Sequence, residues 1–564
     1  MNKGYRWIQK KENKIICLQA VVAMMLPFLS CFVYCLLQGK SIGQVYLPCS
    51  EWNDELFYFK QVEGMVKYGF PQGYFGFNES HAIKLSFAAW SPVLVFPWVI
   101  WGKLFGWTLL SPVICNLVLM AAAMGIFVFL TRIDWKREIV LSLLFFLFTP
   151  FVRYLLSGMP EIICFSMLIV FYGIAVRELR EHSVFCMILL FLMGVVMTLM
   201  RPYLILFLCL PCLILIKRNW KIGLAVSVFA LGSSVGLYGL IKHYLGAEYF
   251  ADLFFTDWVK AYFEKGIFGG MRYTLGKLYY MGKAFGIHLI EGFRSGMASG
   301  AFFAGFITMM GILFWQTIID LRACLMSKSF SSGKLHKDQK ASIKEQNAIT
   351  KQSGMDLEET NAFHITMPDM LLLEAHLLVS FIGMFFALLL MYKLTEGSKH
   401  LLTFIATGIF VVVGMQTKRW IKPLILGVVF FYFYVIMARA PYDYQVPFVQ
   451  EDRQKQIEFW QEQAGDKLKL QRDAVPNYDN VVIWVLSDKK GGEQNIMCPW
   501  QLLYALPEGM GISCCTDEYV WNHFTNLKSK YLVTLSGGDL DLAFQDQKAL
   551  ELIRDEDYVL YQLR

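Results

Sequence analysis

The chain has little charge for its length. Asp, Glu, Lys and Arg make up 17% of its 564 residues, and 56% of the residues are hydrophobic. An average soluble domain carries about 25% charged residues. The apolar residues gather in runs of roughly 20, the length that crosses a hydrocarbon core of about 30 Å. This composition excludes a single soluble domain and predicts a polytopic α-helical membrane protein.

The sequence also lacks the motifs of several other protein classes. Its 13 cysteines include one CxxC pair, Cys209 and Cys212, which falls inside an apolar run, so no zinc site is expected. Ser536-Gly537-Gly538-Asp539 indicates a turn and not a phosphate-binding loop. The net charge of +7 comes from short loops between apolar runs. That pattern is typical of membrane topology and argues against nucleic acid as a partner.

The apolar runs predict about eleven transmembrane helices. We place them at 15–38, 108–131, 139–157, 161–177, 184–200, 203–217, 222–241, 298–320, 370–392, 400–415 and 423–438. Lys and Arg cluster in alternate short loops, which predicts a cytoplasmic N-terminus. A span at Leu85–Phe105 would invert every later loop. Because Pro92 and Pro97 interrupt this stretch and its tryptophans suit an interface, we expect it to lie along the outer membrane face or dip into it.

Polar segments divide the chain into a membrane part, residues 1–440, and a tail, residues 441–564. The membrane part contains a first outer loop (39–107), a second outer loop rich in aromatics and charges (242–297) and a polar cytoplasmic linker (326–369). The tail alternates β-rich runs with helical pieces, which predicts a small extracytoplasmic α/β domain. We therefore expect an integral protein of the cell (plasma) membrane.

Three carboxylates lie within five residues of the first outer loop: Glu51, Asp54 and Glu55. On a helix, Glu51 would share a face with the two residues three and four positions later. Carboxylates that crowd together away from water repel each other, which raises the pKa of one of them toward the range of a general base. The other interpretation is a solvated acidic face beside a membrane anchor.

Further ionisable residues are predicted at the outer ends of spans or in outer hairpins: Arg153, Glu161, Arg201, Glu396, Lys399 and His400. Ionisable groups at membrane depth are costly, so they tend to face cavities or partners. We expect acids that activate a hydroxyl and bases that hold a phosphate to meet on this side. Taken singly, such residues are also explained as interfacial side chains whose charged ends reach water. His81 is a further candidate, with an exposed loop residue as its other explanation.

The order of these features resembles the GT-C glycosyltransferases, membrane enzymes that include protein O-mannosyltransferases and the aminoarabinose transferase of lipid A. A short N-terminus and one span precede a long outer loop with Asp54-Glu55 and, close behind, the aromatic Tyr58. Ala89-Trp90-Ser91-Pro92 follows in the membrane-associated stretch, although Pro92 lacks the His that often stands beside it in the family. The likeness covers residues 15–440.

The resemblance implies a site on the outer face and a polyprenyl-phosphate sugar as donor. Asp54 and Glu55 match the acidic motif that supplies the catalytic carboxylate of the family. Arg201-Pro202 looks like the family's basic residue at an outer hairpin. Gly397-Ser398-Lys399-His400-Leu401 resembles the late hairpin whose basic residue contacts the lipid phosphate.

We therefore hypothesise a glycosyltransferase that moves a sugar from a lipid-phosphate donor to an acceptor hydroxyl, with the following site. Asp54 and Glu55 are the catalytic candidates, and Arg201, Lys399, His400 and Arg153 the donor phosphate-binding ones. Supporting acidic or acceptor-binding candidates are Glu51, Tyr58, Glu161, Glu396 and His81. The spacing requires no cofactor or metal, although carboxylates of this kind are compatible with Mg²⁺ or Mn²⁺.

Three other classes remain open. A transporter or flippase of lipid-linked or envelope glycans is the main alternative, although such proteins commonly show inverted repeats and ionisable groups at mid-membrane. A polysaccharide polymerase or ligase would also use lipid-linked donors, with its main loop expected late in the chain. A scaffold would not need acids and bases that converge on one side.

Overall fold

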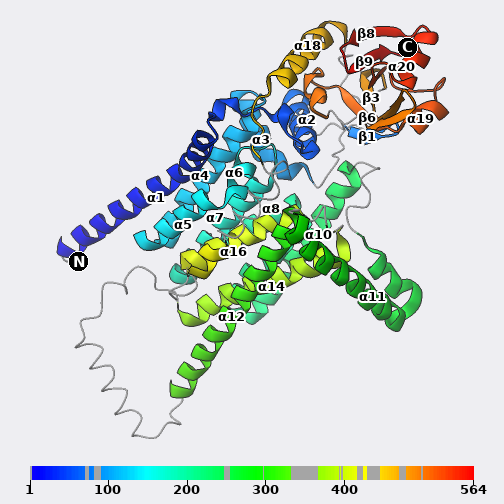
Figure 1. The fold of residues 1–564 in the computed structure, drawn as a ribbon. Coiled ribbons are helices and arrows are strands. Elements are labelled where there is room, and N and C mark those ends of the chain that lie inside the picture. The colour runs from blue at the N-terminus through cyan, green and yellow to red at the C-terminus, as the bar shows by residue number, and fades with distance from the viewer. Residues whose placement is uncertain are drawn as a thin grey trace.

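The computed structural model describes residues 3–69, 75–81, 91–246, 255–295, 298–331, 366–392, 394, 398–415, 423–428, 445–468, 478–496 and 500–564. These residues form a bundle of long helices with a small α/β domain at one end (Figure 1). The helices of the bundle are α1 (Lys3–Leu37), α4 (Ser111–Thr131), α5 (Trp135–Leu147), α6 (Thr149–Leu155), α7 (Glu161–Glu181), α8 (Val184–Met200), α9 (Ile205–Arg218), α10 (Trp220–Leu245), α12 (Ala298–Ser331), α14 (Met367–Met391) and α16 (Leu401–Met415).

Among the described residues, six helical stretches are long and apolar enough to cross a membrane. They are Asn13–Leu37, Ser111–Thr131, Glu161–Glu181, Trp220–Leu245, Gly300–Met326 and Met367–Met391. The α5 and α6 helices together make a seventh if the pair, bent by 71°, is one span. Shorter apolar helices lie at Pro92–Phe105, Val184–Met200 and Leu401–Val412. The chain is therefore an integral membrane protein, while the number of eleven spans and the orientation stay predictions.

Prolines explain two departures from the predicted spans. The expected helix at 139–157 breaks at Phe148, because Pro150 has no amide hydrogen to donate and instead begins α6. The expected helix at 203–217 begins with the 3₁₀ turn Pro202–Leu204 before α9. Most of the predicted span 423–438 lies outside the described residues.

The first loop folds onto the end of the bundle as α2 (Asn53–Tyr68), a 3₁₀ turn (Pro92–Val95) and α3 (Phe96–Phe105). Trp98 of α3 is fully buried and donates its indole hydrogen to the Asn116 side chain of α4 at 3.0 Å. Ile100, Leu104 and Phe105 on the same helix are exposed. Of the stretch Leu85–Phe105, residues 85–90 lie outside the described part of the chain.

The second loop forms α11 (Asp257–Ser295), which folds back on itself at Gly266 and projects from the bundle (Figure 1). Gly266 has φ 68° and ψ −178°, a backbone conformation that residues with a Cβ rarely adopt. Phe285 packs against Phe303 of α12 and Phe385 of α14. This contact holds α11 beside the ends of two apolar helices.

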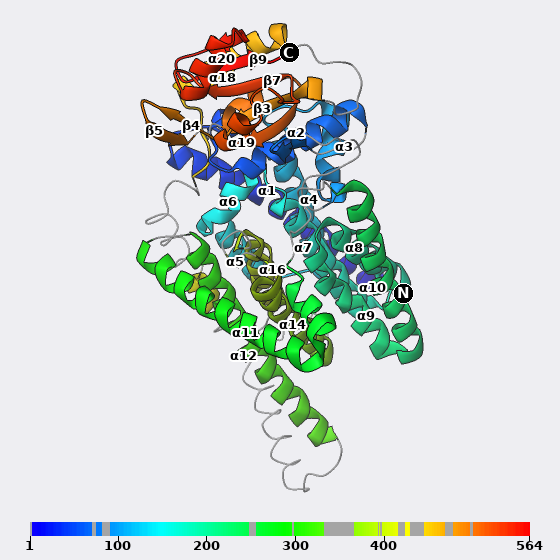
Figure 2. The ribbon, with the colours of Figure 1, turned by 90° about the vertical axis from the view of Figure 1, so that its right-hand side faces the viewer.

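The C-terminal domain is built on a seven-stranded sheet with the order β2-β1-β6-β3-β7-β9-β8. The strands are β1 (Phe75–Phe77), β2 (Ser80–His81), β3 (Val481–Val485), β6 (Gly511–Cys515), β7 (Tyr531–Leu535), β8 (Leu550–Arg554) and β9 (Tyr558–Gln562). A separate hairpin pairs β4 (Ser487–Lys490) with β5 (Glu493–Ile496). The helices α18 (Glu451–Lys467), α19 (Asp517–Asn522) and α20 (Asp539–Asp546) complete the domain (Figure 2).

Two strands of this sheet, β1 and β2, come from the first loop. The β1 strand runs parallel to β6, with Phe75 opposite Ile512 and Phe77 opposite Cys514. The segment that leads into the C-terminal domain also contacts the first loop. The Tyr46 amide donates a hydrogen bond to the Pro447 carbonyl at 2.7 Å. The first loop and the C-terminal domain therefore share one sheet, which the sequence did not predict.

Glu79 fastens the first loop to the C-terminal domain. Its side chain is buried, and its carboxylate accepts hydrogen bonds from the amides of Lys528 and Ser529 and from the hydroxyl of Tyr519, at 2.6–3.3 Å. Its own amide donates to Ser513 Oγ at 2.7 Å. A buried carboxylate with this many donors stabilises the turn between β1 and β2.

Replacing Glu79 with Ala removes the acceptor and leaves the buried amide of Ser529 and the part-buried amide of Lys528 unsatisfied. We expect the C-terminal domain to lose on the order of 3 kcal/mol of stability, with faster hydrogen exchange in residues 75–81. Thermal unfolding and amide exchange of the purified protein measure both effects. Glu518→Ala, at an exposed position of α19, should change stability by less than about 0.5 kcal/mol. Equal effects of the two substitutions would contradict the fastening role of Glu79.

Candidate functional site

The α2 helix presents the acidic residues of the first loop at its first turn. Asp54 and Glu55 lie where the partial positive charge of the helix N-terminus favours carboxylates. Consecutive residues on a helix point in different directions. Glu55 therefore turns into the protein and is fully buried, whereas the Asp54 side chain keeps 36% of its surface exposed. Tyr58, one turn after Asp54, is buried.

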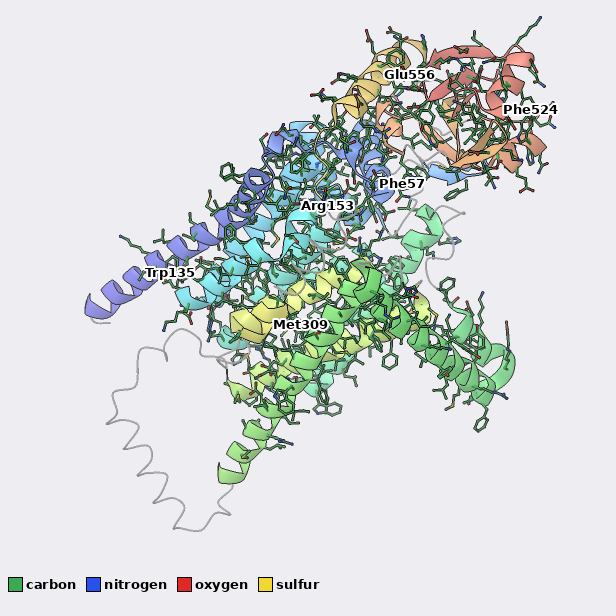
Figure 3. The ribbon with its side chains drawn as sticks, viewed as in Figure 1. Phe57, Trp135, Arg153, Met309, Phe524 and Glu556 are labelled. Atoms are coloured by element: carbon green, nitrogen blue, oxygen red, sulfur yellow. The ribbon has the colours of Figure 1, made fainter. Side chains whose placement is uncertain are left out.

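Glu55 pairs with Arg153 of α6 inside the protein. Arg153 Nη1 lies 3.0 Å from Glu55 Oε1, and Nη2 donates to Ser50 Oγ at 3.0 Å. The guanidinium also lies over the Trp52 ring, 3.6 Å from its centroid. Burial raises the pKa of Glu55, and Arg153 opposes that rise. Figure 3 labels Arg153 in the bundle and Phe57 on α2.

Gly158 allows α2 to come this close to the bundle. A Cβ at Gly158 would stand 3.2 Å from Glu55 Cβ and 3.4 Å from the Glu55 carbonyl oxygen. That separation is tighter than ordinary contacts, so a larger residue would push Glu55 away from Arg153. The close approach therefore fixes the start of α2 against the membrane helices.

Arg201 is the centre of a second buried group. It ends α8 because Pro202 disfavours helical backbone at the preceding residue. Its Nη2 lies 2.8 Å from Glu161 Oε1, and its Nη1 lies 2.7 Å from His400 Nδ1 and 3.0 Å from the Tyr203 hydroxyl. An arginine can only donate, so Nδ1 of His400 accepts and the imidazole is neutral with its proton on Nε2.

Lys399 reaches from the late hairpin to the first loop. It lies in the 3₁₀ turn Ser398–His400, and its ammonium forms an ion pair with the Asp54 carboxylate. The two residues are 345 positions apart in the chain. The Lys399 side chain is 30% exposed. Water and a ligand can therefore reach this pair, unlike the two pairs made by Arg153 and Arg201.

The three ion pairs balance their charges. Asp54, Glu55 and Glu161 supply three negative charges, and Lys399, Arg153 and Arg201 supply three positive ones. Tyr58 lies among them: burial raises its pKa well above the usual value, with the positive charge of Arg201 opposing and the negative charges of Asp54 and Glu161 adding to the rise. The structure thus brings together eight predicted residues: Asp54, Glu55, Tyr58, Arg153, Glu161, Arg201, Lys399 and His400.

The remaining three predicted residues lie elsewhere or outside the described part of the chain. Glu51 is exposed before α2. His81 lies in β2 opposite Gly76, within the C-terminal sheet, and its side chain is outside the described atoms. Glu396 is outside the described residues. Their supporting roles stay predictions.

Sequence reasoning missed residues that hold the acidic segment in place. Ser50 and Trp52 both contact Arg153. Gln501 of the C-terminal domain donates to the Ser50 carbonyl at 2.8 Å. The aromatic residues beside the acidic cluster were a signal for Trp52, whereas nothing in the local sequence marks Gln501. In the part of the chain that the structure describes, no group of three or more His, Cys, Asp or Glu side chains is placed to hold a metal ion.

Comparison with known proteins finds likeness among solved membrane transferases. No family model and no curated protein matches the chain. The oligosaccharyltransferase AglB of Archaeoglobus fulgidus, solved with an inhibitory peptide and a dolichol-phosphate, is 12% identical with a TM-score of 0.44; the match covers 98% of this chain and 73% of that one. The same enzyme tethered to an acceptor peptide gives a TM-score of 0.43 at 12% identity, over 94% of this chain and 70% of that one.

ArnT from Cupriavidus metallidurans, in the apo state, is 13% identical with a TM-score of 0.39, and the match covers 100% of this chain and 99% of that one. AglB and ArnT are both GT-C membrane glycosyltransferases. At this level of similarity the likeness carries no argument about activity, which depends on the side chains described above.

Proposed function

We propose that this protein is a glycosyltransferase that moves a sugar from a polyprenyl-phosphate-linked donor to an acceptor hydroxyl on the outer face of the membrane. The acceptor is a cell-envelope glycan, a lipid or a protein. The observation that carries the proposal is the exposed ion pair of Asp54 and Lys399 beside two buried ion pairs. These pairs support the proposal because a carboxylate and an ammonium lie side by side and partly exposed, next to charges that are buried and paired.

In the proposed reaction, Asp54 accepts the proton of the acceptor hydroxyl as its oxygen attacks the anomeric carbon of the sugar. The bond from that carbon to the phosphate oxygen breaks, and the lipid phosphate leaves with the bonding electrons. Lys399 moves from Asp54 to the phosphate and neutralises the charge that develops there. Direct displacement of this kind inverts the anomeric centre.

The buried pairs act by fixing geometry and electrostatic potential. Arg201 is held by Glu161, His400 and Tyr203, so its positive charge stays in one place without reorganisation during the reaction. Glu55 is buried in an ion pair with Arg153 and positions α2. Because Glu55 is thus paired, Asp54 is the favoured base. The exposed apolar side chains of α3, Ile100, Leu104 and Phe105, provide a surface for the polyprenyl tail.

A transfer assay separates this proposal from a flippase. Proteoliposomes receive a polyprenyl-phosphate donor with a radiolabelled sugar and an acceptor with a free hydroxyl. The proposal expects the label in a new covalent product that survives extraction and chromatography. Movement of the label across the bilayer while it stays on the donor lipid would instead support a transporter.

Replacing Lys399 with Met removes the mobile cation. A charged hydrogen bond to phosphate contributes about 1.5–3 kcal/mol, so the KM for the donor should rise by roughly 10-fold to 100-fold. Lys399→Arg keeps the charge and should stay within a few-fold of wild type. Initial rates at varied donor and saturating acceptor measure the change. Lys40→Met, at an exposed position of the first loop, should leave the KM unaltered, and an unaltered KM in Lys399→Met would contradict the phosphate-binding role.

A further inference from the structure

The C-terminal domain reaches the segment that carries the catalytic candidate. The 3₁₀ turn Trp500–Ala505 of this domain packs on α2, and Gln501 is buried there. Its Nε2 donates to the carbonyl oxygen of Ser50 at 2.8 Å. Trp500 meets the ring of Phe57 edge-on, with centroids 5.6 Å apart. The start of α2 is therefore covered by the C-terminal domain on one side.

The contacts continue along α2. The ring of Tyr504 lies 5.3 Å from that of Phe59. The buried ammonium of Lys60 donates to the Leu506 carbonyl at 3.1 Å while it pairs with Glu63 at 3.0 Å. A buried ammonium that takes a backbone carbonyl from another domain fixes the distance between the two elements. The α2 helix is therefore held along its length and not at one end.

Arg153 holds the same segment from the membrane side. It donates a hydrogen bond to Ser50 Oγ and forms an ion pair with Glu55. Arg153 therefore binds residues before and after Asp54 in the chain. Gln501 of the C-terminal domain donates a hydrogen bond to the carbonyl of Ser50. Among the described residues, the Asp54 side chain has no such clamp beyond its ion pair with Lys399. The direction of its carboxylate is thus set by how Ser50 and Glu55 are held.

We propose that the C-terminal domain is part of the catalytic unit and that Gln501 is a positioning residue for Asp54. This inference rests on the proposed function. A hydrogen bond to the backbone four residues before the base fixes the start of α2, and a misplacement of about 1 Å costs up to 10²-fold in rate. Loss of the Gln501 donor should therefore lower kcat about 10-fold and leave the donor KM unchanged.

The test uses the full-length protein in proteoliposomes with two substitutions at one position. Gln501→Met keeps the length of the side chain without a donor, and Gln501→Glu keeps its shape without the amide hydrogens. Each should lower kcat about 10-fold with an unchanged donor KM, when the rates are measured well below the thermal midpoint of each variant. Gln494→Met is the matched control, because Gln494 lies in the β4–β5 hairpin and contacts Asp517 away from α2. It should keep wild-type kcat.

The same substitutions in an Asp54→Asn background decide how Gln501 acts. If Gln501 works through Asp54, Gln501→Met should change the residual rate of Asp54→Asn by less than about 2-fold, because the effects of coupled residues do not add. A 10-fold fall in that background, or a raised donor KM, would overturn the positioning role. Wild-type kcat in both Gln501 variants would overturn it as well. Wild-type activity in Asp54→Asn alone is a separate result, which would contradict the proposed function.

Discussion

Replacing Asp54 with Asn should lower the rate of sugar transfer by about 10²–10⁴, the usual effect of losing a general base. The amide keeps the size of the side chain but cannot accept the acceptor proton. The Asp54 side chain is partly exposed, as is the Lys399 side chain with which it pairs, so the fold and the donor KM should change little. Single-turnover transfer with saturating donor measures the chemical step directly.

Asp257→Asn is a matched control for this substitution. Asp257 also carries an exposed carboxylate in an ion pair with a lysine, Lys277, at 3.1 Å, but it belongs to α11. Its replacement makes the same change of charge on the second loop and should leave the transfer rate within a factor of about two. If both variants keep wild-type activity, the base is not Asp54. If both lose activity equally, the effect reflects the charge of the surface and not catalysis.

Replacing Glu161 with Leu should cost about 3–5 kcal/mol of stability, because it removes the carboxylate that lies 2.8 Å from the buried Arg201 guanidinium. Arg201 has no exposed surface, and its hydrogen bonds to His400 and Tyr203 are made to neutral groups. The protein cannot hydrate the guanidinium without opening the packing between α7, α8 and the late hairpin. Thermal unfolding in detergent, with the loss of helical signal, measures the effect.

The double variant Glu161→Leu with Arg201→Met should recover much of that stability, since a buried ion pair replaced by apolar residues of similar volume is often neutral. It should still transfer sugar poorly, because the fixed positive charge is gone. Glu181→Gln breaks the exposed pair with Arg177 and should cost less than about 1 kcal/mol. A double variant as unstable as Glu161→Leu would show that the pair is not the source of the loss.

Long apolar runs made the membrane helices predictable. The runs at 108–131 and 161–177 have few breaks, and the structure forms α4 and α7 there. The bend before Pro150 was not predicted, because the apolar run continues from Leu141 across it to Val152. Length and hydropathy predict that a segment is embedded in a membrane, but they do not predict its path.

Part of the candidate site was predictable for an electrostatic reason. Arg153, Arg201 and Lys399 carry charges where burial is expensive, so they were expected to face cavities or partners and to meet the acids on one side. In the structure each of them pairs with a carboxylate. The sequence could not tell which acid pairs with which base, because that depends on distances across the bundle. It therefore left Glu55 and Asp54 with similar roles, whereas the structure buries one and exposes the other.

The pairing of β1 in the first loop with β6 in the C-terminal domain was not predictable from one sequence. The β1 strand has three residues, Phe75–Phe77, and its partner β6 lies more than 400 positions later. Backbone pairing of this kind leaves no local pattern beyond the aromatic residues. The anchoring role of Glu79 and the contact made by Gln501 depend on this packing of the first loop against the C-terminal domain. They were unpredictable for the same reason.

The most direct test is a structure of the protein in lipid nanodiscs with a polyprenyl phosphate. We expect the phosphate within ion-pair distance of Lys399, near Arg201, with the Asp54 carboxylate released and open to the acceptor side. The lipid tail should follow the apolar face of α3. A phosphate bound elsewhere, with Asp54 and Lys399 still paired in the complex, would contradict the proposed site.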